Sequence, residues 1–313
     1  MTVAGGAGTG AAAAPGQVRH VVRRAADAVW AEPGWAGGGP GFRRWPVVGE
    51  QSGAVHTGFG VCELAPGGSV PARVSSFELS VFVLAGPVVL DTAEASVRLV
   101  EGDYGLVPVG VPHAVRNDGG SAARWAEMQA PAPRSRLDHD TVAVPPLPHR
   151  DPVGVDVRDP RTRSFGHIEP SNMDVDKQTQ DMLAASASMR TALLVYSGIT
   201  VRMMVDSDLG AQLSTMFMVQ YVPEGVAGAH DHPFEETYLI LEGAVEASFD
   251  GERHRLEAGD AAWAGVGCVH SFRNLGPGVV RWLETQAPQP PGRHSYRFAR
   301  DWDYLRSALE RRG

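Results

Sequence analysis

The sequence has little of what marks several large classes of protein. Only two cysteines, Cys62 and Cys268, occur among its 313 residues, so a disulfide framework is excluded and two reduced thiols are expected. No run of about 18 apolar residues is present, which argues against a membrane-spanning helix. The net charge of -8 leaves no basic field for nucleic acid. We therefore expect a cytoplasmic protein that contacts neither membrane nor nucleic acid.

Helical signals are few and lie mostly outside the central part of the chain. Residues 1–19 are rich in Ala and Gly and lack a basic segment, which predicts a disordered tail and no signal peptide. A short helix is expected between residues 20 and 30, and another over 171–185 with Ser171 as its N-cap. Trp302, Leu305 and Leu309 recur at helical spacing, which predicts an amphipathic helix within 293–313.

Strand signals dominate the rest of the chain. Short β-branched runs alternate with Gly and Pro turns over residues 54–131, and the same pattern returns between 192 and 284. Such regular short strands predict sandwiches or closed barrels. The clearest expected strands of the first half are 80–84, 88–91, 97–100, 106–109 and 125–128. Between the two regions, residues 131–160 are rich in proline, which indicates an extended connector.

The two strand-rich regions are copies of each other. His113 corresponds to His270, an offset of 157 residues, and no gap is needed between residues 66 and 131. The clearest block is the match between residues 124–131 and 281–288. The chain is therefore interpreted as a duplicated β domain.

One stretch of the second copy carries a candidate metal site. His230, His232 and Glu236 have the same parity, so one extended segment could aim all three at a single point, and His270 could join them from a second strand. Three imidazoles and one carboxylate suit one divalent ion, with Fe or Mn expected and Zn, Ni or Co also compatible. The alternative is a set of strand histidines on a solvated face.

The first copy has lost this donor set. The four positions are Arg73, Ser75, Leu79 and His113, and neither Arg nor Leu can ligate a cation. We therefore predict one metal site, in the second half. His113 is interpreted as a structural hydrogen-bonding residue, and Arg73 as either a carboxylate clamp or an exposed rim residue.

Residues that both copies keep are assigned to the scaffold. Glu235 recurs as Glu78, so a shared structural role is expected for it, in contrast to its neighbour Glu236. By the same reasoning Trp282, Glu284 and Gln286 are interpreted as structural.

These motifs resemble those of the cupin superfamily. The first motif is matched by His230, His232, Glu236 and Gly243, and the second by Gly259, Gly267, His270 and Asn274. The resemblance implies an all-β bicupin with two tandem double-stranded β-helix (jelly-roll) barrels and a few short helices. The expected divisions are 20–135 for a barrel without metal, 136–190 for a connecting segment and 191–292 for the barrel with metal.

Candidate substrate contacts lie close to the expected ligands in sequence. Phe272 shares the parity of His270 and is expected to line the cavity. Tyr238 shares the parity of Glu236 and could contact substrate or pack at the base of the barrel. Met218 lies on the preceding strand, where it could contact substrate or only fill the barrel. No catalytic residue beyond the metal ligands is identified.

Three functions remain open at this stage. The first is an Fe(II) dioxygenase of a small organic substrate, such as a phenol or a small organic acid, which rests on the cupin resemblance. The second is an oxygen-independent metal enzyme such as an aminohydrolase, isomerase, lyase or decarboxylase. Its layout is similar to the ureidoglycine aminohydrolase family, although His230 and His270 stand where that family has Glu and Gln. The third is a non-catalytic cupin that binds a small molecule. Self-association, as a homodimer, is also expected.

Overall fold

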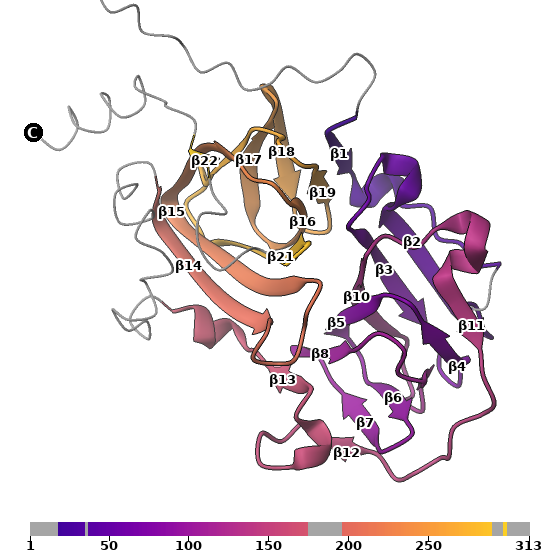
Figure 1. Cartoon of the computed structure of the whole chain (residues 1–313). Coiled ribbons are helices and arrows are strands. Elements are labelled where there is room, and N and C mark those ends of the chain that lie inside the picture. Colours follow the sequence, from indigo (N-terminus) through magenta and orange to yellow (C-terminus); the bar gives the residue numbers. More distant parts are fainter. Residues whose placement is uncertain (1–17, 35–36, 175–195, 290–296, 299–313) are drawn as a thin grey trace, which may run out of the picture.

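The computed structural model describes residues 18–34, 37–174, 196–289 and 297–298, and strands make up most of the regular structure (Figure 1). The strands up to the connector are β1 (His20–Arg23), β2 (Phe42–Val48), β3 (Gly58–Leu64), β4 (Ser69–Ser75), β5 (Glu78–Ala85), β6 (Val88–Thr92), β7 (Ser96–Leu99), β8 (Asp103–Val107), β9 (His113–Arg116), β10 (Ala123–Ala130), β11 (Thr141–Ala143), β12 (Val153–Gly154) and β13 (Phe165–His167). The later strands are β14 (Tyr196–Val205), β15 (Thr215–Asp231), β16 (Glu235–Glu242), β17 (Ala244–Phe249), β18 (Glu252–Glu257), β19 (Ala261–Ala264), β20 (His270–Arg273), β21 (Val280–Ala287) and β22 (Arg297–Phe298). Short 3-10 helices are η1 (Ala25–Asp27), η2 (Glu50–Ser52), η3 (Ser135–Asp140), η4 (Pro160–Thr162) and η5 (Pro170–Met173).

These strands form two barrels of jelly-roll type, as the duplication predicts. The first barrel has two six-stranded sheets, in the orders β13-β8-β5-β10-β3-β2 and β11-β4-β9-β6-β7-β12. The strands of the second barrel form one ten-stranded sheet, in which the long strand β15 pairs with β21 along its first part and with β20 along its last. Strands β5, β9 and β10 start and end 157 residues before β16, β20 and β21. The all-β prediction is confirmed.

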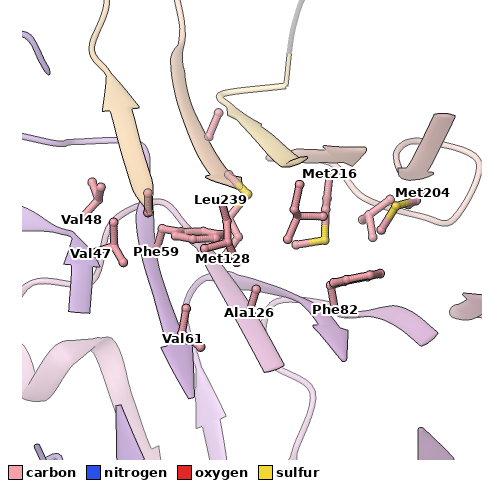
Figure 2. Close-up of a cluster of buried hydrophobic side chains, with 14 of the residues drawn as sticks. Val47, Val48, Phe59, Val61, Phe82, Ala126, Met128, Met204, Met216 and Leu239 are labelled. Carbon is pink, nitrogen blue, oxygen red and sulfur yellow. The ribbon is translucent and has the colours of Figure 1, made fainter. Parts of the chain in front are cut away.

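Alternation along the strands divides each sheet between two cores. On β15, Phe217 and Val219 face the interior of the second barrel, whereas Met216 and Met218 face the first barrel. Figure 2 shows this shared core, where Phe59, Val61 and Met128 of the first barrel meet Met204, Met216 and Leu239 of the second. Since a fully buried side chain of this size contributes about 1.5–3 kcal/mol, the two barrels stabilise each other through this contact.

Two buried glutamates join the barrels in a reciprocal manner. Glu235 of the second barrel accepts hydrogen bonds from the backbone N–H groups of residues 55–57 in the first, at 2.8–3.2 Å. Glu78 of the first barrel accepts from the N–H groups of Gln212 and Leu213, at 2.6 and 2.9 Å, and from the hydroxyl of Ser214. The acceptors and the donor segments are both related by the offset of 157 residues. This reciprocal pair explains why both copies keep a glutamate at this position.

The helix expected between residues 20 and 30 is a wrong prediction. His20–Arg23 forms strand β1, which pairs antiparallel with β19 of the second barrel, and only Ala25–Asp27 makes a single 3-10 turn (Figure 1). Val21 and Val22 are β-branched, and the exposed edge of β19 supplies backbone partners that no local signal reveals. Residues 20–23 were expected to belong to the first barrel, but their hydrogen bonds with β19 place them on the second.

The other expected helices are only partly tested. Ser171 does not act as an N-cap, because it lies inside η5, where Glu169 precedes the first helical residue. The remainder of 171–185, most of the tail over 1–19 and the helix over 293–313 lie outside the described residues, apart from the short strand β22. Within the described ranges, no helix is long and apolar enough to cross a membrane.

The proline-rich connector is extended and lies along the first barrel. Its strand β11 pairs with β4, and β12 pairs in parallel with β7. Both are edge strands, the position in which neighbouring prolines cost no ladder hydrogen bond.

The reciprocal glutamates predict a measurable contribution to stability. Glu235→Gln replaces a charged acceptor of three backbone donors with a neutral amide, whose NH2 group cannot accept. We expect the free energy of unfolding, measured by urea denaturation, to fall by about 1.5–3 kcal/mol, the usual range for hydrogen bonds to charged groups. Glu94→Gln changes an exposed glutamate and is the matched control. Equal stability of the two variants would contradict the assigned role of Glu235.

Candidate metal centre

Three strand ends bring four polar side chains together inside the second barrel. His230 lies near the end of β15, directly opposite His270 on β20, and Glu236 lies on β16. Ligand nitrogens of the three histidines lie within 4.8 Å of one another. Glu236 Oε2 is 2.8 Å from His232 Nε2 and 3.3 Å from His270 Nε2. The predicted convergence is therefore present, although the chain turns after Asp231, so Glu236 belongs to a second strand and not to one extended segment.

Hydrogen bonds to the backbone orient all three imidazoles. Nδ1 lies 2.7 Å from Gly228 O in His230, 3.0 Å from Phe234 O in His232 and 2.9 Å from Cys268 O in His270. A carbonyl oxygen can only accept, so each neutral imidazole carries its hydrogen on Nδ1 and its lone pair on Nε2. This is the orientation that protein ligands of metal ions commonly have.

The carboxylate is held by two further side chains. Gln286 Nε2 donates to Glu236 Oε1 at 2.6 Å, and the Tyr238 hydroxyl donates to Glu236 Oε2. Phe234 stacks on the ring of His232, with centroids 3.8 Å apart. Glu236 is only 2% exposed and each histidine at most 4% exposed, so these groups have little bulk water to solvate them.

Charges in this interior are strongly perturbed. Burial alone raises the pKa of Glu236, but the imidazoles of His232 and His270 outweigh it and bring that pKa well below its usual value. Burial, followed by the charge of Glu236, raises the pKa of Glu284 well above its usual value. Burial and His270 lower the pKa of His230 well below its usual value and keep its ring neutral. The site thus holds one ionised carboxylate, that of Glu236, beside the neutral ring of His230.

This donor set fits a divalent metal ion. Buried His270 Nε2 makes no hydrogen bond to any described residue, although its ring orientation is fixed. Two imidazole nitrogens face the carboxylate oxygen, and a cation between them would turn repulsion between lone pairs into attraction. Nitrogen and carboxylate donors suit Fe, Mn, Zn, Ni and Co alike, so the donor types alone do not select the ion.

Comparison with known proteins shows the family to which the chain belongs. A family model described as "Cupin domain" matches residues 60–128 and 217–285. The tetracenomycin polyketide synthase protein TcmJ of Streptomyces glaucescens is 30% identical over 119 residues, which are 36% of this chain and 80% of TcmJ. The chain belongs to the cupin family. It contains two cupin domains and is a bicupin.

Solved structures show how widely this bicupin fold is shared. Oxalate decarboxylase from Lactobacillus farciminis superposes with a TM-score of 0.59 at 15% identity, covering 91% of this chain and 89% of that one. Salicylate 1,2-dioxygenase from Pseudaminobacter salicylatoxidans superposes with a TM-score of 0.54, also at 15% identity, covering 74% of this chain and 71% of that one. At these identities the likeness establishes the fold.

In the first cupin domain a guanidinium replaces the first histidine. Arg73 is 5% exposed, so its interpretation as an exposed rim residue is wrong. Its Nε–H donates to His113 Nε2 at 3.3 Å, and His113 Nδ1 lies 3.0 Å from Val111 O. His113 therefore has the structural hydrogen-bonding role that was predicted. Among the described residues, no group of three potential metal ligands lies inside this barrel.

The three candidate substrate contacts have different outcomes. Tyr238 and Phe272 lie inside the second barrel with ring centroids 4.7 Å apart, and the Phe272 ring is 6.0 Å from that of His270. Met218 is a wrong prediction, because it points away from this interior. It lines a cleft of about 690 Å³ between the barrels, to which none of the three site histidines contributes. That Tyr238 and Phe272 touch substrate stays a prediction.

Two residues beside the site were missed. Gln286 was assigned to the scaffold because it recurs as Gln129, yet it pairs directly with Glu236 across β16 and β21. Parity with Glu284 on β21 was the signal that could have found it. Phe249 also lies in this interior, 6.4 Å from His270 between ring centroids.

The donor geometry predicts one metal ion per chain. Purified protein incubated with Mn(II) and desalted is expected to hold one equivalent by elemental analysis, and His232→Ala to hold close to none, because the ion loses a ligand. His113→Gln alters the matching position of the first barrel and should retain the full equivalent. Loss of metal from His113→Gln alone would contradict the placement of the site.

His113 predicts a pH dependence of stability. Burial, followed by the charge of Arg73, lowers its pKa from 6.5 to about 4. His113 therefore binds a proton near pH 6.5 in the unfolded chain but only near pH 4 in the folded chain. The free energy of unfolding falls as the pH falls through this window. At 1.36 kcal/mol per pKa unit the loss is on the order of 3 kcal/mol. His113→Gln should remove this component from urea denaturation curves recorded between pH 4 and 7. A pH profile identical to that of the native chain would refute it.

Proposed function

We propose that this bicupin is a metal-dependent enzyme with a single active site in its second barrel, and that it is an Fe(II) dioxygenase of a small organic substrate. The observation that carries the metal is the approach of Glu236 Oε2 to two imidazole nitrogens whose hydrogens are committed elsewhere. The proposed ligands are His230, His232, Glu236 and His270. A proton on one imidazole would relieve the same repulsion, and the metal analysis above separates these two cases.

The chain's own residues prepare the site for such chemistry. An Fe(II) ion supplies Lewis acidity and a place for dioxygen when it is bound. Backbone carbonyls fix the imidazoles, and Gln286 and Tyr238 fix the carboxylate, so no donor has to reorganise. Burial and the charge of Glu236 raise the pKa of Glu284, which opposes a second negative charge beside the proposed carboxylate ligand.

The surroundings favour an aromatic substrate. Tyr238, Phe249 and Phe272 form a cluster of rings around His270, with neighbouring centroids 4.7–6.0 Å apart. Such rings stack on another ring with a gain of about 0.5–1.5 kcal/mol beyond burial. The name of one similar protein, a salicylate 1,2-dioxygenase, is consistent with a phenolic substrate.

An oxygen-independent reaction is the second candidate. The same four donors would serve an ion that only polarises a substrate carboxyl or carbonyl, as a decarboxylase, aminohydrolase, isomerase or lyase requires. Oxalate decarboxylase shares the fold over more of this chain than the dioxygenase does. A non-catalytic binding role is the third possibility, and it predicts no turnover with any metal.

Oxygen consumption separates these candidates. Fe(II)-loaded protein with a panel of phenols and small organic acids should consume dioxygen in an electrode cell, in proportion to product formed. His230→Ala should lower the rate at least 100-fold. Loss of a residue that only hydrogen-bonds to a metal ligand typically costs about 10–100-fold, and loss of the ligand itself should cost more. The Fe(II)-loaded His113→Gln variant is the control. Product formation at an equal rate without oxygen would instead favour the second candidate.

A further inference from the structure

A second cavity opens at the first barrel, far in sequence from the metal centre. Its volume is about 300 Å³, and its walls come from β2, η2 and η3. Its charged and polar lining includes Arg44, Gln129 and His139 together with Arg23, Glu32 and Glu50, and Pro46, Val48 and Pro133 are among its apolar walls. The metal chemistry uses none of these residues.

Arg44 brings a buried positive charge to this cavity. Its side chain is 12% exposed, and Nε lies 3.4 Å from Glu127 Oε1. Nη2 donates to Gln129 Oε1 at 3.2 Å, which leaves Nη1 without a hydrogen bond to any described residue. Buried Nε also lacks a hydrogen bond of good geometry. The guanidinium therefore has donors available to a ligand.

Glycines make room for this guanidinium. A Cβ on Gly60 would lie 2.8 Å from the Arg44 Cζ, and a Cβ on Gly58 would lie 2.9 Å from Gln129 Oε1. In the second barrel the positions of Arg44 and Gly60 are Val201 and Phe217, and Phe217 is buried in the barrel core. The arginine and the space around it are thus particular to the first barrel, as the histidines are to the second.

Around Glu127, inside the first barrel, two guanidinium groups share one carboxylate. Arg44 and Arg73 are both near Glu127, the one carboxylate that acts on both of them. Burial, followed by Glu127, raises the pKa of Cys62 well above its usual value, so this thiol stays neutral. His113 is neutral as well, since its pKa is about 4. Two guanidinium charges therefore face one carboxylate, and an anion would balance the remainder.

A strained turn delivers His139 to the same cavity. Asp138, His139 and Asp140 have φ values of 49°, 53° and 52°, which is a left-handed conformation that non-glycine residues rarely adopt. The turn is held by Arg134, which donates to both carboxylate oxygens of Asp140 at 3.0 and 2.6 Å. Strain of this kind persists where the surrounding structure enforces it, and it is common at ligand sites.

From these features we propose that the cavity binds a small organic carboxylate, with Arg44 as its principal partner and His139 beside it. A guanidinium presents a planar pair of donors that matches a carboxylate. Apolar walls of Pro46, Val48 and Pro133 favour an organic anion over a hydrated inorganic one. On this proposal the first barrel binds an anion through Arg44, at a position that does not correspond to the proposed metal site of the second barrel.

Binding of butyrate tests this site. The His230→Ala background removes the metal centre as a competing carboxylate site, and ligand-observed NMR titration at constant ionic strength, adjusted with chloride, measures the dissociation constant. Arg44→Gln is expected to weaken binding at least tenfold. Arg43→Gln is the matched control, because it removes the same charge from the next residue of β2, whose exposed side chain pairs with Glu63.

Each outcome decides the proposal. Circular dichroism shows whether Arg44→Gln folds, and if it does not, His139→Asn takes its place, since asparagine tolerates a positive φ. His139→Asn is expected to weaken binding several-fold. Binding that is equal in Arg44→Gln and Arg43→Gln overturns the site, as does no butyrate binding in the folded parent. Equal competition by chloride overturns the carboxylate class.

Discussion

The interior of the second barrel depends on one interaction, the approach of a buried carboxylate to imidazole nitrogens that also carry lone pairs. Glu236 lies 2.8 Å from His232 and 3.3 Å from His270, while backbone carbonyls hold the Nδ1 hydrogens of both rings. Such an arrangement is costly unless a positive charge lies within it. The strand pairing of β15 with β20 and the contacts of Gln286 and Tyr238 keep it in place.

Because the domain is duplicated, the way in which a buried glutamate is accommodated can be compared between the two barrels. Each barrel places a glutamate at the same position of its central strand, Glu127 on β10 and Glu284 on β21, with a glutamine two residues later. The first barrel places guanidinium groups near Glu127, whereas in the second burial and the charge of Glu236 raise the pKa of Glu284. At the contact between the barrels, both copies keep the reciprocal hydrogen bonds of Glu78 and Glu235. The two copies thus diverged inside while the contact between them was retained.

Much of this could be predicted from sequence because alternation and repeat spacing are local properties. Glu235 and Glu236 are neighbours with opposite parity, and comparison with Glu78 and Leu79 assigned them correctly to the scaffold and to the site region. Alternation along a strand shows which side chains share a face but not which core that face contacts. Met218 was therefore assigned to the wrong core. Strand β1 and buried Arg73 were missed for a similar reason, since their partners lie far away in sequence. The ion and the substrate depend on geometry that the spacing of residues does not encode.

Anomalous scattering at the manganese edge, from crystals grown with Mn(II), tests the central claim most directly. The account predicts one strong peak in each chain, bounded by Nε2 of His230, His232 and His270 and by a carboxylate oxygen of Glu236, and no peak beside Arg73. A peak elsewhere, or hydrogen-bonded imidazolium rings around Glu236 with no peak at all under these conditions, would contradict it.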